Sequence, residues 1–426
     1  MAGVIRTRLD GRKPLPVDSG MNKHDFPSPA RHSPVRRAIT DLNPNGIALV
    51  AGTALGDPDV IALWFGESDL VTPAFIREAA KQALDEGRTF YSNARGIPPL
   101  REAIRDFHRR VSGADIALER ITVPGSAMLA VVTALQSVID TGDNIVALAP
   151  VWPNIFQAAE ICGAEVKFAT LDDDWRASPP QWRLDLAKLF DACDARTKAI
   201  FIASPGNPTG WVMSREEQIS VLDFARKRGI AILSDEVYGT ILYDGRAHAP
   251  SFLEIADADD AVFVINSFSK PWAMTGWRIG WLVHPASLEQ QMWMMSAANN
   301  TGATTFAQYG ALAALSPQGD AFRGEMLERC RVGNATVEDW IGEQNRIRWI
   351  APEGAFYGFL HVEGMRDSLE FCKDLVKNAR VGTAPGSAFG APNDPYTDSF
   401  VRVCFAQDAV RVRTGLDRLA KAVAAM

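Results

Sequence analysis

Between residues 73 and 304, short uninterrupted apolar segments alternate with amphipathic stretches of helical period. This alternation constrains the fold most, because a strand that is apolar on both faces needs cover on both faces. The apolar segments predict strands at 121–123, 144–148, 165–170, 197–203, 230–233 and 261–265. The stretches between them predict helices at 74–87, 97–111, 127–139, 155–162 and 215–228. We therefore expect an α/β domain over 73–304, with a mostly parallel sheet between helices.

The pattern changes after residue 304. Helices are predicted at 306–315, 322–344, 368–378 and 409–424, with shorter strands at 347–350, 355–361 and 399–405. This predicts a smaller α+β domain over 305–426, against which residues 38–72 pack. The first 37 residues carry eight Lys or Arg and five Pro. So many prolines disfavour a regular helix, and we expect a basic arm that lies on a partner subunit or stays mobile.

The composition narrows the classes of function. Hydrophobic residues form 47% of the chain and charged residues 22%, as in ordinary soluble globular proteins. The net charge of −7 argues against a nucleic-acid partner, and no apolar stretch is long enough to cross a membrane. The five cysteines include no Cys-x-x-Cys pair, and the six histidines show no metal-ligand spacing. We therefore expect no metal site and a reducing, cytoplasmic setting.

One lysine directly follows the last predicted strand of the α/β series, in Ser267-Phe268-Ser269-Lys270. A lysine at the end of a buried strand can have its amine partly desolvated. Desolvation favours the neutral, nucleophilic form that makes Schiff bases with carbonyls. Ser267 and Arg278, which comes eight residues after Lys270, are suited to a bound phosphate. These residues match pyridoxal 5′-phosphate, an aldehyde that carries a phosphate.

Two more polar side chains follow predicted strands. Asn207 lies in Ser204-Pro205-Gly206-Asn207-Pro208-Thr209-Gly210, which alone indicates a plain turn, but which also holds an amide at a strand end. Asp235 follows the strand at 230–233. It is either a helix cap or solvated acid, or a buried anion that keeps a pyridine nitrogen protonated. In the second case the ring becomes a strong electron sink.

Two further strand ends are suited to a flat, phosphorylated ligand. Gly125-Ser126-Ala127-Met128 opens a predicted helix, and amides at a helix N-terminus bind phosphate, although Ser126 is also an ordinary cap. Trp152 follows the strand at 144–148 and is either core filler or a stacking partner for a ring. Neither Gly-x-Gly-x-x-Gly nor Gly-x-x-x-x-Gly-Lys-[Ser/Thr] occurs, which argues against nicotinamide and nucleotide folds.

Several motifs occur together in one order: Asn-Pro-Thr-Gly at 207–210, Asp-Glu-Val-Tyr at 235–238, Ser-x-x-Lys at 267–270, Gly-x-Arg-x-Gly at 276–280 and Pro-Gly-Ser-Ala-Phe-Gly at 385–390. In this combination the chain, from about residue 63 to 405, resembles the fold-type I pyridoxal-phosphate-dependent class I/II aminotransferases of the aspartate aminotransferase superfamily. The resemblance implies a mostly parallel seven-stranded sheet between helices, with a smaller α+β domain. It also implies amino transfer from an L-amino acid to a 2-oxo acid by a homodimer with shared active sites.

Position by position, the resemblance implies how the cofactor is held. Lys270 forms the Schiff base and then shuttles a proton. Asp235 pairs with the pyridine nitrogen, while Asn207 and Tyr238 hydrogen-bond the ring oxygen. Trp152 stacks on the ring. The implied phosphate ligands are Ser126, the amides of Ala127 and Met128, Ser267 and Arg278.

On the substrate side, Arg402 resembles the arginine that binds the α-carboxylate as a bidentate pair, although a strand arginine taken alone faces solvent. Gly66 resembles the glycine that lines the substrate side, and Asn207 is also implied to bind the substrate. Tyr91 resembles the tyrosine that reaches the phosphate of the neighbouring subunit. Ser68 stands where the family often has proline, which frees the substrate-side loop. No motif places an arginine for the distal carboxylate of dicarboxylic substrates.

Two alternatives to amino transfer stay open at this point. The same chemistry at the substrate Cα serves C–S lyases and cyclopropane-forming lyases, and the fold does not separate them from aminotransferases. Some regulators carry an aminotransferase-like domain behind a DNA-binding domain. Here about sixty residues precede Gly66, and they are rich in proline without a helix-turn-helix pattern, which disfavours that class.

Overall fold

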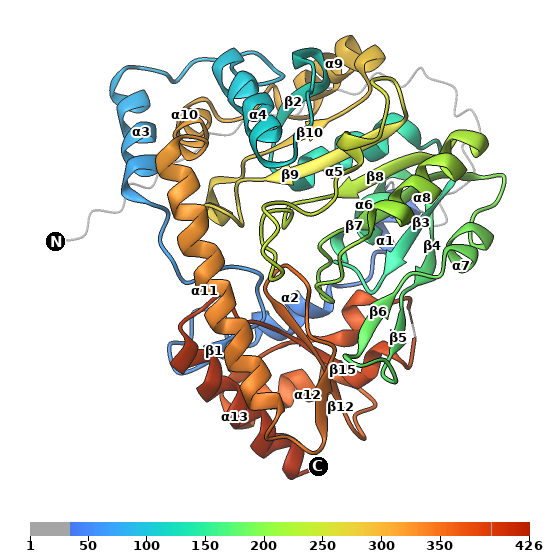
Figure 1. The fold of residues 1–426 in the computed structure, drawn as a ribbon, viewed down its shortest axis with the longest axis vertical. Coiled ribbons are helices and arrows are strands. Elements are labelled where there is room, and N and C mark those ends of the chain that lie inside the picture. Colours follow the sequence, from blue (N-terminus) through green and yellow to red (C-terminus); the bar gives the residue numbers. More distant parts are fainter. Residues whose placement is uncertain (1–34, 393) are drawn as a thin grey trace, which may run out of the picture. The chain divides into compact units, whose positions relative to one another are not determined.

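The computed structural model describes residues 35–392 and 394–426. Residues up to Asp41 belong to a unit of their own, in which a short helix, α1, covers Arg37–Thr40. The predicted basic arm therefore lies almost entirely outside the described residues. Leu42–Met426 forms the second unit, which contains both the large sheet and a smaller one (Figure 1).

The large sheet has seven strands within the described residues, in the order β2-β10-β9-β8-β7-β3-β4. The six predicted strands are β2 (Ile121–Gly125), β3 (Asn144–Ala149), β4 (Glu165–Thr170), β7 (Thr197–Ala203), β8 (Ala231–Asp235) and β9 (Val262–Ser267). The seventh, β10 (Gly280–Val283), runs antiparallel to both of its neighbours, while the other pairs are parallel. The mostly parallel sheet predicted from the apolar segments is thus confirmed.

Burial on both faces explains why these strands appear as continuous apolar runs. In β7, Phe201 packs into a cluster with residues of α5 (Ala127–Val138) and α6 (Asn154–Cys162). Its neighbour Ile202 belongs to a separate cluster that includes residues of α8 (Arg215–Arg228). Because successive side chains on a strand point to opposite faces, one apolar segment stabilises two cores.

Local signals set the ends of the helices around this sheet. The α8 N-terminus has a capping box, in which Ser214 accepts from the Glu217 N–H and the Glu217 side chain accepts in return, and Gly229 ends the helix at a φ of 66°. Proline starts or precedes α3 (Ala74–Asp85) and α4 (Pro98–Val111), where its missing N–H costs nothing.

Several elements were not predicted. Among them are the short helix α7 (Leu186–Asp191), the helix α9 (Glu289–Asn300) and the hairpin of β5 (Asp172–Asp174) with β6 (Gln181–Arg183). The helix α7 is too short for a helical period to be recognised, and β5 consists of three aspartates. In α9 apolar residues are not confined to one face, since Trp293 and Met294 are both exposed.

The smaller sheet is antiparallel and has the order β11-β12-β15-β14 within the described residues. Its strands are β11 (Ile347–Trp349), β12 (Tyr357–Val362), β14 (Ala384–Pro385) and β15 (Phe400–Cys404). The helices of this part of the chain are α10 (Thr305–Ala314), α11 (Pro317–Ile341), α12 (Ser368–Asp374) and α13 (Ala409–Ala424). The long helix begins five residues earlier than predicted, because Ser316 caps it and proline is tolerated in its first turn.

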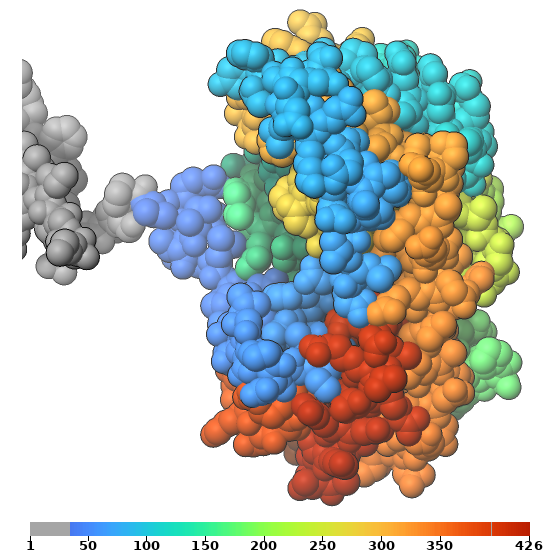
Figure 2. Space-filling view, turned by 90° about the vertical axis from the view of Figure 1, so that its left-hand side faces the viewer, coloured from blue at the N-terminus to red at the C-terminus, as the bar shows by residue number. Residues whose placement is uncertain are grey.

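Residues 46–72 lie along the C-terminal part of the chain. The strand β1 (Ile61–Ala62) pairs in parallel with β13 (Val381–Gly382), and α2 (Gly46–Gly52) contacts β14 and α12. Figure 2 shows these blue and red surfaces side by side. The predicted domain boundaries at residues 72 and 304 stay predictions. Within 35–392 and 394–426, no helix combines the length and the apolar character that crossing a membrane requires.

Candidate active site

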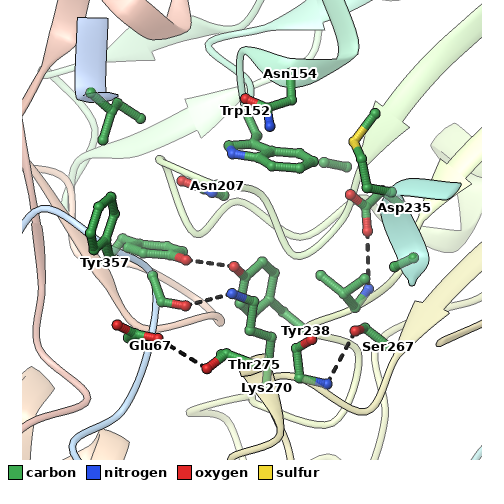
Figure 3. Close-up of a pocket in the computed structure, with 18 of the residues that line it drawn as sticks. Glu67, Trp152, Asn154, Asn207, Asp235, Tyr238, Ser267, Lys270, Thr275 and Tyr357 are labelled. Carbon is green, nitrogen blue, oxygen red and sulfur yellow. Dashed lines mark hydrogen bonds between the residues drawn. The ribbon is translucent and has the colours of Figure 1, made fainter. Parts of the chain in front are cut away.

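A cavity of about 570 Å³ is lined by residues that follow the carboxyl ends of large-sheet strands and by residues of the smaller sheet (Figure 3). Ligands of parallel α/β sheets bind outside these strand ends. The lining includes every predicted site residue except Ser126 and Tyr91. The predicted residues in it are Gly66, Ala127, Met128, Trp152, Asn207, Asp235, Tyr238, Ser267, Lys270, Arg278 and Arg402.

Lys270 lies in the turn that follows β9, with its amine in the cavity. Its Nζ donates a hydrogen bond to the Gly66 carbonyl at 2.5 Å and lies 5.9 Å from the centre of the Tyr238 ring. Burial lowers the pKa of the Lys270 amine to about 8. A pKa in this range leaves a usable fraction of neutral amine near neutral pH, and the neutral form is the nucleophile.

Asp235 is the last residue of β8 and faces the same cavity. Within the described part of the chain its carboxylate accepts one hydrogen bond, from the Val237 N–H at 3.3 Å. Burial raises the pKa of Asp235 to about 6, although this hydrogen bond and the Lys270 charge lower it. A carboxylate with so few partners is suited to a cationic group of a ligand.

Arg402 lies on β15 and is only 2% exposed, which excludes a solvent-facing arginine. Its Nη1 donates to Asn207 Oδ1 at 2.9 Å, and its Nη2 donates to the Trp64 carbonyl. Its Nε is buried without a hydrogen-bond partner, and no described carboxylate pairs with the guanidinium. A buried cation in this state is costly. The guanidinium is therefore suited to an anionic ligand, such as a carboxylate.

The start of α5 forms another wall of the cavity. Ala127 and Met128, its first two residues, line the cavity with the free N–H groups of a helix N-terminus. Such groups carry partial positive charge and bind anions. Ser126 caps the helix by accepting from the Leu129 N–H at 3.2 Å, so its side chain holds these amides in place and does not itself line the cavity.

A guanidinium group lines the same cavity as the start of α5. Arg278 lines the cavity and donates from Nη1 to the Thr275 carbonyl at 2.6 Å. It has no ion-pair partner among the described residues. Ser267, at the end of β9, accepts from the Ser269 N–H at 3.1 Å. With the start of α5, these groups could hold a phosphate.

The Trp152 indole lies across the cavity from Lys270 (Figure 3). Figure 3 also shows Asn207 and Tyr238 in the space between these two residues in the view, with Asp235 to one side. The arrangement provides a flat aromatic face on one side, an amine on the other and polar groups around the edge. It is suited to a planar ring with polar substituents.

A model of the aminotransferase class I and II family matches residues 58–419. The chain belongs to this family. It is similar to a probable aspartate/prephenate aminotransferase of Aquifex aeolicus, with 33% identity over 372 residues that cover 86% of this chain and 91% of that protein. It is also similar to an aromatic-amino-acid aminotransferase 2 of Thermococcus litoralis, with 30% identity over 383 residues, covering 89% and 96%. A solved single mutant of the Thermus thermophilus aspartate aminotransferase superposes with a TM-score of 0.81 at 28% identity, covering 92% of this chain and 100% of that one.

Membership of the class I and II aminotransferases confirms the resemblance that the motifs indicated. The structure and its solved relatives also confirm the fold class, a mostly parallel sheet between helices with a smaller antiparallel sheet. The roles that the resemblance implied for single residues stay predictions, and the geometry above brings most of those residues into one cavity.

The aminotransferase cavity contains further side chains that sequence reasoning missed. Tyr357, the first residue of β12, is 1% exposed and lines the cavity. A tyrosine in an apolar strand is usually core filler. No local sequence signal pointed to Tyr357, because it reaches the cavity through the pairing of β12 with β15. Glu67 also lines the cavity and accepts from the Thr275 hydroxyl at 3.0 Å; only its neighbour Gly66 pointed to it.

Tyr91 lies outside this cavity and is 89% exposed. It lines a second hollow together with Phe90 and residues 300–306. The role predicted for Tyr91 concerns a neighbouring subunit, and it stays a prediction.

Proposed function

We propose that this protein is a pyridoxal 5′-phosphate-dependent aminotransferase that transfers the amino group of an L-amino acid to a 2-oxo acid. One observation carries this proposal: the Lys270 amine shares a cavity with Arg402, a buried arginine that pairs with no described carboxylate, and with the start of α5. A carboxylate and a phosphate can therefore bind near the same nucleophile. The family membership and the names of the relatives support the same function.

Pyridoxal phosphate fits the chemistry of the lining. The amides of Ala127 and Met128, oriented by Ser126, would hold the phosphate with Ser267 and Arg278. Asp235, which has few partners of its own, would pair with the ring nitrogen. Asn207 and Tyr238 would hydrogen-bond the ring oxygen, and Trp152 would stack on the ring. When bound, the cofactor supplies an aldehyde and a ring that withdraws electrons from the substrate Cα.

The residues of the chain then have distinct tasks. Arg402 binds the α-carboxylate through two parallel hydrogen bonds and so orients the Cα–H bond. Asn207, which contacts Arg402, holds the guanidinium in place. Lys270 Nζ would take the proton from Cα as a general base and would then donate it as a general acid to the aldehyde carbon of the cofactor. Such positioned proton transfer is typically worth about 10²–10⁴-fold in rate. Gly66, without a side chain, leaves room for the Tyr357 hydroxyl at the edge of the cavity.

The proposal is tested with Lys270→Ala. We expect this variant to lose turnover with every amino acid and 2-oxo acid pair, and to lose the absorbance of the lysine-bound cofactor. Lys188→Ala is a matched control, because Lys188 is an exposed lysine that pairs with Asp172. Wild-type transamination by Lys270→Ala would contradict the assignment. Product analysis separates the lyase alternatives, since pyruvate and ammonia from a single substrate indicate elimination.

We also propose a cytoplasmic homodimer in which Tyr91 reaches the active site of the partner subunit. The exposure of Phe90 (82%) and Tyr91 (89%) supports this, because large exposed aromatic side chains that lie together are typical of interfaces. No disulfide joins the five cysteines, all of which lie in the described residues, and this fits a reducing compartment. Light scattering of the holoenzyme measures its mass, and a Tyr91→Ala variant with unchanged cofactor affinity would contradict the shared site.

A further inference from the structure

We propose that Tyr357 is a positioning residue that holds Tyr238, the Gly66 backbone and Arg402 in one arrangement. This role rests on the aminotransferase function proposed above. Tyr357 contacts all three groups from β12, and each of them borders the space around Lys270. Figure 3 shows its ring beside Tyr238, with a hydrogen bond between the two hydroxyl groups.

The contact with Tyr238 is a buried pair of phenols. The two Oη atoms lie 2.5 Å apart, and the rings meet edge to face with centres 5.6 Å apart. Each hydroxyl carries one proton. If Tyr238 donates its proton to the ring oxygen of the cofactor, it must accept from Tyr357. The Tyr357 hydroxyl is then the donor and Tyr238 Oη the acceptor. A hydrogen bond accepted by Tyr238 strengthens the hydrogen bond that Tyr238 itself donates.

The contact with Gly66 is steric. A Cβ atom added to Gly66 would lie 1.9 Å from Tyr357 Oη, so the hydroxyl occupies the place of a side chain at that position. The Gly66 carbonyl accepts the hydrogen bond of Lys270 Nζ at 2.5 Å. Tyr357 therefore packs against the backbone segment that holds the amine in its resting position.

The contact with Arg402 uses the ring. The Arg402 guanidinium carbon lies 4.5 Å from the centre of the Tyr357 ring, within the range of a cation–π interaction. The ring therefore acts on Arg402, while the hydroxyl acts on Tyr238 and Gly66. Substitution by phenylalanine separates the two, because it removes the hydroxyl and retains the ring.

The test measures Tyr357→Phe and Tyr357→Leu as holoenzymes. A weakened Tyr238 hydrogen bond stabilises the ring-oxygen anion less. We therefore expect Tyr357→Phe to raise the pKa of the lysine-bound cofactor chromophore by about 0.5–1, the equivalent of one ordinary hydrogen bond. We expect kcat to fall about threefold to tenfold, with KM for the amino acid unchanged. Tyr357→Leu should raise KM as well, because one of the two aromatic rings that lie against the Arg402 guanidinium, those of Tyr357 and Phe389, is lost.

The control is Tyr243→Phe, which removes a hydroxyl that donates to the Ala355 carbonyl at 2.5 Å, just before β12. It loosens the same segment without touching the Tyr238 pair, and its chromophore pKa should equal that of the wild type. In a Tyr238→Phe background, we expect removal of the Tyr357 hydroxyl to produce no further pKa change.

The positioning role is overturned if the chromophore pKa of Tyr357→Phe is unshifted. It is also overturned if Tyr243→Phe shows a shift of equal size, or if removal of the Tyr357 hydroxyl shifts the pKa equally in the Tyr238→Phe background. Failure of the wild type to form the chromophore with pyridoxal phosphate overturns the proposed function itself, and the positioning role with it. The chromophore distinguishes the two failures before any activity is measured.

Discussion

Arg402→Met tests the use of the buried arginine. Methionine fills much of the same space without charge or hydrogen-bond donors. If Arg402 binds the α-carboxylate with two charge-assisted hydrogen bonds, each worth about 1.5–3 kcal/mol, their loss costs about 3–6 kcal/mol. At about 1.4 kcal/mol per factor of ten, kcat/KM for amino acids should fall about 10²–10⁴-fold.

The cofactor-free fold should change little in the same variant. The substitution removes a buried cation whose Nε has no partner, which relieves a desolvation cost. It also leaves Asn207 Oδ1 and the Trp64 carbonyl without their donor, which costs a similar amount. We therefore expect a thermal midpoint within a few degrees of the wild type, as measured by circular dichroism.

The assay compares substrates with and without the carboxylate. Single-turnover rates are measured for phenylalanine and for phenethylamine, which differ by that group alone. Arg402→Met should slow the reaction with phenylalanine and leave the slow reaction with phenethylamine unchanged. An equal loss of rate with both compounds would refute carboxylate binding by Arg402. It would mean that Arg402 only maintains the structure of the cavity.

Three further predictions concern protonation and capping. Burial raises the pKa of Asp235 to about 6, so the folded protein binds this proton more tightly than the unfolded chain, and the cofactor-free protein should lose stability as pH rises from about 4 to 6. Asp235→Asn should not show this loss of stability between thermal melts at pH 4.5 and pH 7.5. If the wild type and Asp235→Asn change equally between these pH values, the assignment of the loss to Asp235 is wrong. Burial lowers the pKa of Lys270 to about 8, so the rate at which cofactor-free protein captures pyridoxal phosphate should rise through pH 8 as the neutral amine increases; a flat stopped-flow profile from pH 7 to 9 would disagree. Ser126→Ala removes the α5 cap and should lower the free energy of unfolding by about 1 kcal/mol in urea titrations, with weaker cofactor binding, whereas unchanged values would mean that the cap is redundant.

Much of the cavity could be predicted because the fold itself gathers the residues. Asp235 is the last residue of a buried strand, and Asn207 and Lys270 lie in the turns that follow two others. Parallel strands place their carboxyl ends at one edge of the sheet. Strand prediction and short polar motifs were therefore sufficient to bring these three side chains together.

Other features depend on pairings that the sequence does not display. Tyr357 reaches the cavity because β12 pairs with β15, with Phe359 opposite Arg402, and nothing local distinguishes it from core filler. The same pairing helps to bury Arg402, which from its sequence context alone would face solvent. The strand β10, with four residues, follows directly on the Arg278 turn and was not predicted.

The resting partner of Lys270 is a main-chain carbonyl, that of Gly66. A substitution at position 66 changes the side chain but keeps this main-chain acceptor. The pKa of the Lys270 amine can therefore be changed only through the other residues that line the cavity. A carbonyl is also neutral. When Nζ loses its proton, no unpaired anion stays behind, as it would beside a carboxylate. The lysine can thus leave its partner at the cost of one ordinary hydrogen bond, which suits a group that must repeatedly detach and return.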